Sequence, residues 1–210
     1  MITEPKWKSF IVETLQPMFT PKQCQMIINA GKAEPKQNAQ VGSNISKKDG
    51  ILDTETRTSH ISWIPFKKMG DMYKDIERIM KTTNGNHFGF DGMQITEMAQ
   101  YTENPEGGFY DWHVDNDVNM QHEPPVRKIS MTLLLSPESE FEGGDLELMS
   151  ENKVAKIDYQ PPMNLRDFYI FPYDMRHVVY PFNGTTETRR TLAANCDVLF
   201  DPIKNRGAEW

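Results

Sequence analysis

The feature that most constrains the fold is a series of short β-type segments that fills the second half of the chain. These segments are rich in β-branched and aromatic residues, and turns such as Pro105-Glu106-Gly107-Gly108 and Glu142-Gly143-Gly144 separate them. Several short strands between regular turn signals are typical of a barrel or a two-sheet sandwich. The predicted strands are Met93–Tyr101, Phe109–Val114, Ile129–Leu135, Asp145–Met149, Asp167–Phe171, Arg176–Tyr180 and Arg189–Leu199.

The first half of the chain carries helical patterns. Thr20 and Gln23, three residues apart, match a capping box and predict a helix start, and Gly31 predicts the end of that helix. Apolar side chains recur every three or four positions over residues 66–80, which predicts a second helix. The pair Asn84-Gly85 predicts where this second helix stops.

A polar stretch over residues 33–53 lies between the two predicted helices. Loops of this length are uncommon in compact domains unless they cover a site or remain unstructured, so we expect residues 33–60 to form a substrate loop. The expected organisation is a single domain over residues 1–210. Residues 1–85 supply a helical flank and the substrate loop, and residues 86–203 supply the β core.

Composition narrows the classes of function. No apolar run approaches the roughly 20 residues of a membrane helix, and the N-terminus lacks the pattern of a secretory signal, so we expect a cytoplasmic protein without a membrane partner. The net charge of -7 weighs against a nucleic-acid partner, whose phosphates require lysine and arginine. The two cysteines, Cys24 and Cys196, have no neighbour at CxxC spacing, which argues against a thiolate zinc site.

One group of residues has the composition of a metal site. His113 and Asp115 are two positions apart on a predicted strand, so both side chains face the same side. His177 lies on a later predicted strand. Two histidines and one carboxylate form the facial triad of non-haem Fe(II) oxygenases, which leaves coordination positions open for other ligands. A His-x-Asp pair alone is a weak signal, because short motifs also arise by chance.

A candidate anion site follows the second histidine. Arg189 and Arg190 open the last predicted strand, and arginine offers a planar, two-pronged donor to a carboxylate. Strand alternation places Arg189 and Thr191 on one face, together with small or polar residues that suit a pocket lining. This pattern favours Arg189 as the partner of a dicarboxylate, with Arg190 as the alternative.

Three blocks occur in order along the chain. They are Tyr101–Asp115, which contains the His-x-Asp pair, Arg127–Leu146, which contains the Gly143-Gly144 turn, and Phe168–Arg189, which contains His177. Together they resemble the prolyl 4-hydroxylase-like branch (PKHD-type hydroxylases) of the Fe(II)/2-oxoglutarate-dependent dioxygenases. Three blocks in one order are far more specific than any single motif. The upstream segment Arg57–Trp63 also resembles a segment of bacterial and phage-type members.

The resemblance implies a mainly β fold with flanking α-helices. Its core would be a double-stranded β-helix (jelly-roll, cupin-like), with the N-terminal helices packed on one sheet. It implies Fe(II) and 2-oxoglutarate as cofactors, O₂ as co-substrate and ascorbate as a supporting reductant. The implied catalytic and metal-binding residues are His113, Asp115 and His177. The implied 2-oxoglutarate contacts are the Tyr101 hydroxyl and Arg189, with Thr191 beside it on the strand. The basic residue lies further from the second histidine than is usual in this family, which leaves Arg190 open as the alternative.

The substrate that the resemblance implies is a prolyl residue of a peptide or protein. Arg57, Tyr110 and Trp112 are the candidate substrate contacts, because they lie in or next to the matching segments. The same chemistry on a free amino acid or a nucleic-acid base remains an alternative. So does a catalytically silent binding or sensing module of the same fold. A zinc hydrolase would also use two histidines and a carboxylate, but it would leave Arg189 without a role.

Overall fold

The computed structural model describes most of the chain, in nine stretches. These are residues 11–14, 16–42, 50–115, 126–136, 142–152, 155–159, 168–172, 176–183 and 189–198. The helical elements are α1 (Pro21–Lys32), the 3₁₀ turn η1 (Phe66–Lys68) and α2 (Gly70–His87). The strands are β1 (Val12–Glu13), β2 (Gln37–Asn38), β3 (His60–Ile64), β4 (Met93–Gln94), β5 (Ala99–Asn104), β6 (Tyr110–His113), β7 (Val126–Leu134), β8 (Glu142–Gly143), β9 (Leu146–Asn152), β10 (Ala155–Tyr159), β11 (Phe168–Pro172), β12 (Arg176–Val179), β13 (Phe182–Asn183) and β14 (Arg189–Val198).

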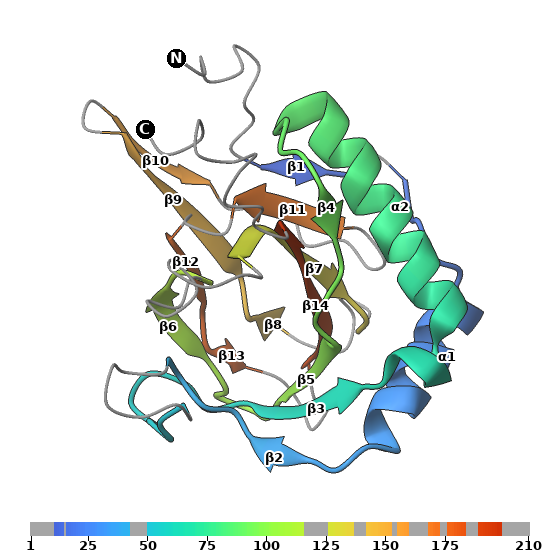
Figure 1. The fold of residues 1–210 in the computed structure, drawn as a ribbon. Helices are drawn as coiled ribbons and strands as arrows, with labels where there is room; N and C mark the ends of the chain where they lie inside the picture. The colour runs from blue at the N-terminus through green and yellow to red at the C-terminus, as the bar shows by residue number, and fades with distance from the viewer. Residues whose placement is uncertain are drawn as a thin grey trace.

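Two antiparallel sheets face each other across the interior of the molecule (Figure 1). The larger sheet has the order β1-β11-β7-β14-β5-β3-β2, and β4 also pairs with β14. The smaller sheet has the order β10-β9-β12-β6, and β13 pairs with β8 in a short separate ladder. Strands that are distant in sequence lie side by side in both sheets. This confirms the expected mainly β fold with a double-stranded β-helix core.

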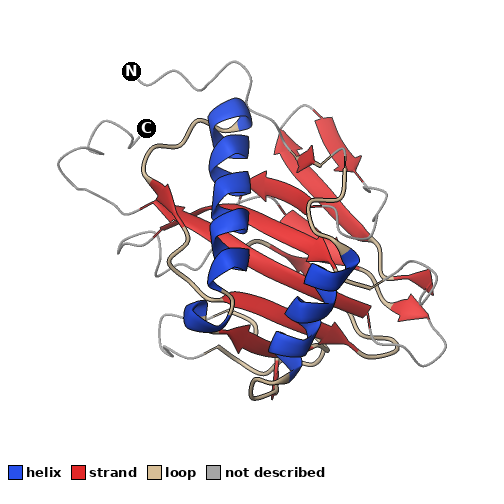
Figure 2. Cartoon of the chain, turned by 90° about the vertical axis from the view of Figure 1, so that its right-hand side faces the viewer, coloured by secondary structure: helices blue, strands red, loops and turns tan. Residues whose placement is uncertain are grey.

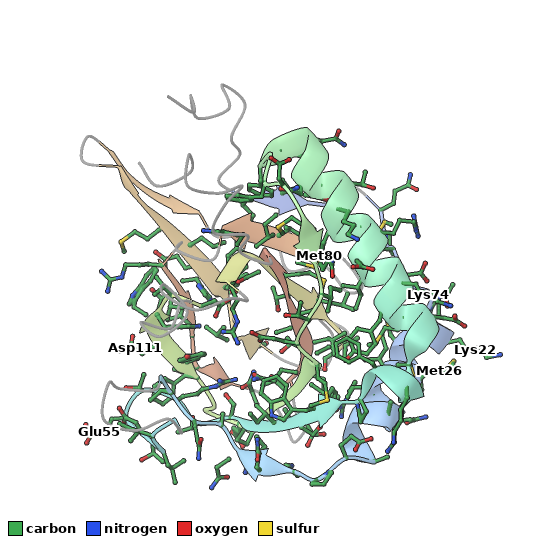
Figure 3. All side chains as sticks on the ribbon, viewed as in Figure 1. Lys22, Met26, Glu55, Lys74, Met80 and Asp111 are labelled. Carbon is green, nitrogen blue, oxygen red and sulfur yellow. The ribbon has the colours of Figure 1, made fainter. Side chains whose placement is uncertain are left out.

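Both α-helices lie on the outer face of the larger sheet (Figures 1 and 2). Their apolar faces and one face of the sheet form the main hydrophobic core, in which Met80 of α2 is fully buried. Figure 3 shows Met80 directed toward the sheet, whereas Lys74 on the same helix points away from it. Among the described helices, none combines the length and the apolar character that crossing a membrane requires. Because both helices cover the outer face of the larger sheet, its inner face remains available to a site.

The start of α1 confirms the predicted capping box. The Thr20 side chain accepts a hydrogen bond from the Gln23 backbone N–H, and the Gln23 side chain accepts one from the Thr20 backbone N–H at 2.9 Å. The predicted ends of both helices were wrong. Helix α1 continues past Gly31 to Lys32, and α2 continues past Asn84 and Gly85 to His87. Gly31 is needed for packing, since a Cβ atom there would lie 2.3 Å from the nearest ring carbon of Tyr101.

This contact predicts opposite effects for two glycine substitutions. Gly31→Ala should lower the free energy of unfolding by about 1–3 kcal/mol, because the added methyl group overlaps the buried Tyr101 ring. Gly85→Ala should raise it by roughly 0.5–1 kcal/mol, because that helical position has open space and alanine loses less backbone entropy. Urea unfolding of the two variants measures both values. Equal effects at the two positions would contradict the packing role of Gly31.

The helical flank expected for residues 1–85 also contributes strands. β1, β2 and β3 all join the larger sheet, and β3 pairs along most of β5. The segment before residue 65 is therefore a full member of the sheet. Residues 43–49 of the predicted substrate loop lie outside the described stretches, whereas residues 33–42 and 50–60 are described.

Candidate active site

The two histidines of the predicted triad are brought together by strand pairing in the smaller sheet. His177 on β12 lies directly opposite His113 on β6 in the antiparallel register. Their ring centroids are 3.9 Å apart. Residues directly opposite on an antiparallel pair are close neighbours on one face of the sheet, so the ladder itself fixes the distance between the two imidazoles.

Asp115 completes the group two residues after the end of β6. Its Oδ1 lies 3.7 Å from Nε2 of His113 and 3.8 Å from Nε2 of His177. One ligand atom from each of the three residues lies within 4.8 Å of the others. The three residues could therefore hold one metal ion, as the two-residue spacing of His113 and Asp115 predicts.

Neighbouring groups fix the orientation of the His113 ring. Its Nδ1 lies 2.8 Å from the backbone carbonyl oxygen of Asp111, which suits donation by an Nδ1–H group and leaves Nε2 as the ligand atom. Tyr110 stacks on the ring, with centroids 3.4 Å apart and planes 15° apart. Burial and the neighbouring His177 lower the pKa of His113 to about 3, against the opposing effect of Asp115. The imidazole is therefore neutral near pH 7, which is the form that binds a metal.

Asp115 is held in its ionised form. Burial alone would raise the pKa of this carboxyl group, but the two histidines, the Ser130 hydroxyl and the Arg127 guanidinium outweigh it and lower the pKa. Phe171 lies against His177, with ring centroids 4.8 Å apart. The donor set is thus two imidazoles and one carboxylate beside an apolar wall, which fits a divalent transition metal such as iron.

The triad lies on the wall of a cavity of about 600 Å³ between the two sheets. The larger sheet contributes alternate residues of β5 to its lining, namely Gln100, Thr102 and Asn104. The described parts of the predicted substrate loop also reach it through Gln37, Gln40, Gly42 and Gly50. This volume is in the range of small-molecule pockets, so the cavity has room for ligands beside a metal ion.

Tyr110 reaches the cavity because β6 is irregular. The four residues of β6 from Tyr110 to His113 are matched by only three residues of β12, from His177 to Val179. An extra residue of this kind is a β-bulge, which bends the strand and changes where its side chains point. Tyr110 and His113 therefore lie on the same side, although strict alternation would separate them.

Arg57 lies over the Tyr110 ring. Its guanidinium carbon is 4.4 Å from the ring centroid, its Nη2 donates to Gln100 Oε1 at 2.8 Å, and its Nε donates to Ser59 at 3.4 Å. The side chain lines the cavity and is buried, and burial lowers its pKa. Within the described part of the chain, no aspartate or glutamate forms an ion pair with Arg57. A buried cation thus faces the cavity close to the triad.

The predicted contact between the Tyr101 hydroxyl and 2-oxoglutarate is corrected by the face of the sheet on which Tyr101 lies. Tyr101 alternates with the cavity-lining residues and lies on the helix side of the sheet, 2% exposed, in the main hydrophobic core. Its hydroxyl donates to Oε1 of Glu103 at 3.1 Å. Tyr101 is not among the residues that line the cavity around the triad, so its hydroxyl does not serve a ligand there.

The remaining predicted contacts divide between the two faces of β14. Thr191 lines the cavity. The backbone of Arg189, two positions before it on the strand, pairs with Asn104 of β5, and the side chain of Arg189 lies outside the described part of the structure. Arg190 alternates with them, and its charge acts on Tyr101, on the helix side. Trp112 of β6 is half-buried and is not among the described residues that line the cavity.

Sequence reasoning missed several residues of the cavity wall. The polar positions of β5 alternate with Ala99 and Tyr101, so the polar and apolar faces of that strand were readable from the sequence. The contact between Arg127 and Asp115 joins parts of the chain that only the fold brings together, and no local pattern marks it.

Comparison with known proteins gives one family and several similar structures. The family model described as the 2OG-Fe(II) oxygenase superfamily matches residues 96–196, which include the whole triad. No curated protein sequence matches the chain.

The similar solved structures include three prolyl hydroxylases. A prolyl-4-hydroxylase from Pseudomonas putida has a TM-score of 0.66 and 14% identity, over 91% of this chain and 94% of that chain. A prolyl hydroxylase from Trichoplax adhaerens, solved with a peptide fragment of a hypoxia-inducible factor, has a TM-score of 0.66 and 14% identity, over 96% and 87%. The viral collagen prolyl hydroxylase of Paramecium Bursaria Chlorella virus-1, solved with 2-oxoglutarate, has a TM-score of 0.61 and 14% identity, over 91% and 97%. At these identities the likeness establishes the fold.

Proposed function

This chain belongs to the 2OG-Fe(II) oxygenase superfamily, and we propose that within it the chain hydroxylates prolyl residues of a peptide or protein. The observation that carries the proposal is the convergence of His113, Asp115 and His177 on one point of a cavity between the sheets. These three residues are the proposed iron ligands. When bound, iron and 2-oxoglutarate couple the decarboxylation of 2-oxoglutarate to succinate with the insertion of one oxygen atom of O₂ into a substrate C–H bond.

The protein residues prepare the site for that chemistry. The ladder between β6 and β12 sets the spacing of the two imidazoles, and the Asp111 carbonyl fixes the tautomer of His113. The carboxylate of Asp115 favours hydroxylation over halogenation, in which a halide has to take its place. The open side of the triad is the proposed location of 2-oxoglutarate and O₂.

Arg189 and Thr191 are the proposed partners of the distal carboxylate of 2-oxoglutarate. Both positions are in phase along β14, and Thr191 lines the cavity. Asn104 and Thr102 pair with them from β5 and also line the cavity. The location of Arg190 on the other side of the strand supports Arg189 over the alternative.

The substrate side of the cavity is proposed to lie around Arg57 and Tyr110, next to the described parts of the loop over residues 33–60. Arg57 is held by Gln100 and by the face of Tyr110, so its remaining donors are fixed before a substrate arrives. A peptide carbonyl or a carboxylate is the kind of group that accepts hydrogen bonds from such donors. The peptide in the Trichoplax adhaerens structure supports a peptide substrate by analogy of fold.

Replacing Arg57 should therefore affect the substrate more than the cofactors. Arg57→Met should raise the KM for the substrate about tenfold to hundredfold, as expected when a charged hydrogen bond is lost. Arg57→Lys should give a smaller change, because it keeps the charge but loses the two-pronged donor. The binding of 2-oxoglutarate should stay close to that of the wild type. Arg78→Met, which removes an exposed ion pair on α2, is the matched control. An unchanged KM in Arg57→Met would exclude the residue from the substrate site.

The proposal as a whole is tested by substrate-dependent turnover. Peptides rich in proline with both ends blocked should stimulate succinate formation and gain one oxygen atom by mass, and the same peptides with alanine for proline should do neither. Hydroxylation of a free amino acid is the second candidate, which the buried Arg57 cation favours because its N–H groups can donate to an α-carboxylate. Turnover with free amino acids and none with blocked peptides would replace the first candidate by the second.

A further inference from the structure

Arg127, at the beginning of β7, connects two segments that are distant in sequence. Its Nε donates to both carboxylate oxygens of Glu97 at 3.1 and 3.2 Å, and its Nη2 donates to Oε2 at 2.5 Å. Its Nη1 donates to the backbone carbonyl oxygen of Asp115 at 3.1 Å. The side chains of Arg127 and Glu97 are each only 22% exposed, so solvent screens this ion pair less than it screens an ion pair on the surface.

Asp115 differs from the two histidines in how it is held. His113 and His177 lie opposite each other within a strand ladder, but Asp115 lies beyond the end of β6, where ladder bonds no longer set the backbone. Its exposed neighbour Val114 adds little packing. Side-chain contacts from Arg127 to its carbonyl and from Ser130 to its carboxylate therefore contribute much of its restraint.

We infer that Glu97 and Arg127 position Asp115 for metal binding. Glu97 engages one edge of the guanidinium, and because the guanidinium is planar this fixes the direction of the remaining Nη1–H group. That group binds the carbonyl of Asp115, so the backbone is restrained while the carboxylate stays directed at the two histidines. The pair acts through Asp115, and its role rests on the proposed assignment of Asp115 as an iron ligand.

The test measures Co(II) binding, followed by visible absorption, without 2-oxoglutarate or substrate. Arg127→Met should weaken Co(II) binding about tenfold to hundredfold, as typical for groups that support a ligand, and should change the shape of the absorption bands. Glu97→Gln, which keeps the size of the side chain, should act in the same direction. The double variant should bind Co(II) no more weakly than Arg127→Met, because both changes remove one contact. Arg127→Lys should restore part of the affinity, and Arg78→Met is the control outside the site.

His177→Ala separates this inference from the ligand assignment. If His177→Ala loses Co(II) binding but Arg127→Met and Glu97→Gln keep the affinity and spectrum of the wild type, the positioning role is overturned. A lower melting temperature of the metal-free variants would then mark the pair as purely structural. Co(II) binding that survives in His177→Ala would overturn both the ligand assignment and the role of Arg127. Should Arg127→Met fail to fold, Glu97→Gln decides alone.

Discussion

The His113→Ala protein should fold as the wild type does and form no detectable succinate with any substrate. Its turnover should fall by at least about a thousandfold, because a catalytic metal ion contributes several kcal/mol to lowering the barrier. The ring of His113 is already neutral and takes part in stacking with Tyr110, so its loss removes little charge interaction from the metal-free fold. Succinate formation and the melting temperature of the metal-free protein are the two measurements.

His87→Ala is the matched control for this prediction. His87 is a half-buried histidine at the end of α2 and does not line the cavity of the triad. Its replacement should leave turnover unchanged. Full turnover in His113→Ala would contradict the assignment of the metal ligands. If His113→Ala fails to fold while His87→Ala folds, His177→Ala takes the place of His113→Ala in the test.

The second large effect concerns the cofactor. Arg189→Leu should raise the KM for 2-oxoglutarate roughly a hundredfold, because it removes the proposed partner of the distal carboxylate, and the loss of one partner of a charge pair in a binding site costs about 3 kcal/mol. The KM for the substrate that is hydroxylated should change far less. Steady-state kinetics with 2-oxoglutarate as the varied substrate measure this effect.

Arg190→Leu provides the comparison within the same strand. Because Arg190 lies on the helix side of β14, its replacement should lower stability and leave the KM for 2-oxoglutarate near that of the wild type. The reverse result, a high KM in Arg190→Leu and a normal one in Arg189→Leu, would exchange the roles of the two arginines.

The sequence was sufficient to predict the metal-binding triad. The two-residue period of a strand places His113 and Asp115 on one side, and this holds even though Asp115 lies just outside β6. The position of most strands followed from turn residues and β-branched segments. The joining of His177 to the pair depended on the order of the three sequence blocks, because nothing local to His177 specifies its partner strand.

The phase and pairing of strands could not be predicted in the same way. Tyr101 has the same local signals whichever face of β5 it occupies, and only the fold shows that its ring packs beside Gly31 of α1 in the main hydrophobic core. The bulge in β6, which brings Tyr110 onto the ring of His113, arises from pairing with β12 and has no marker in the sequence. Long-range contacts decide both features, and these contacts determine which side chains enter the cavity.

Dependence on long-range pairing also explains why the strands within the first 85 residues were not predicted as part of the sheet. β2 and β3 are stabilised by pairing with each other and with β5, so their sequence alone indicates only extended backbone. The capping box of α1 was predicted correctly because it depends on residues three positions apart. Local chemistry was readable, and tertiary pairing was not.

The most direct test of the central claim is an anaerobic titration of the purified protein with Fe(II) and 2-oxoglutarate, followed by visible absorption. We predict a weak charge-transfer band of the iron chelate that appears only when both are present, that is lost in His177→Ala, and that needs far more 2-oxoglutarate in Arg189→Leu. Absence of the band in the wild-type protein, together with tight binding of zinc, would contradict the assignment and would mean that His113, Asp115 and His177 serve a different metal.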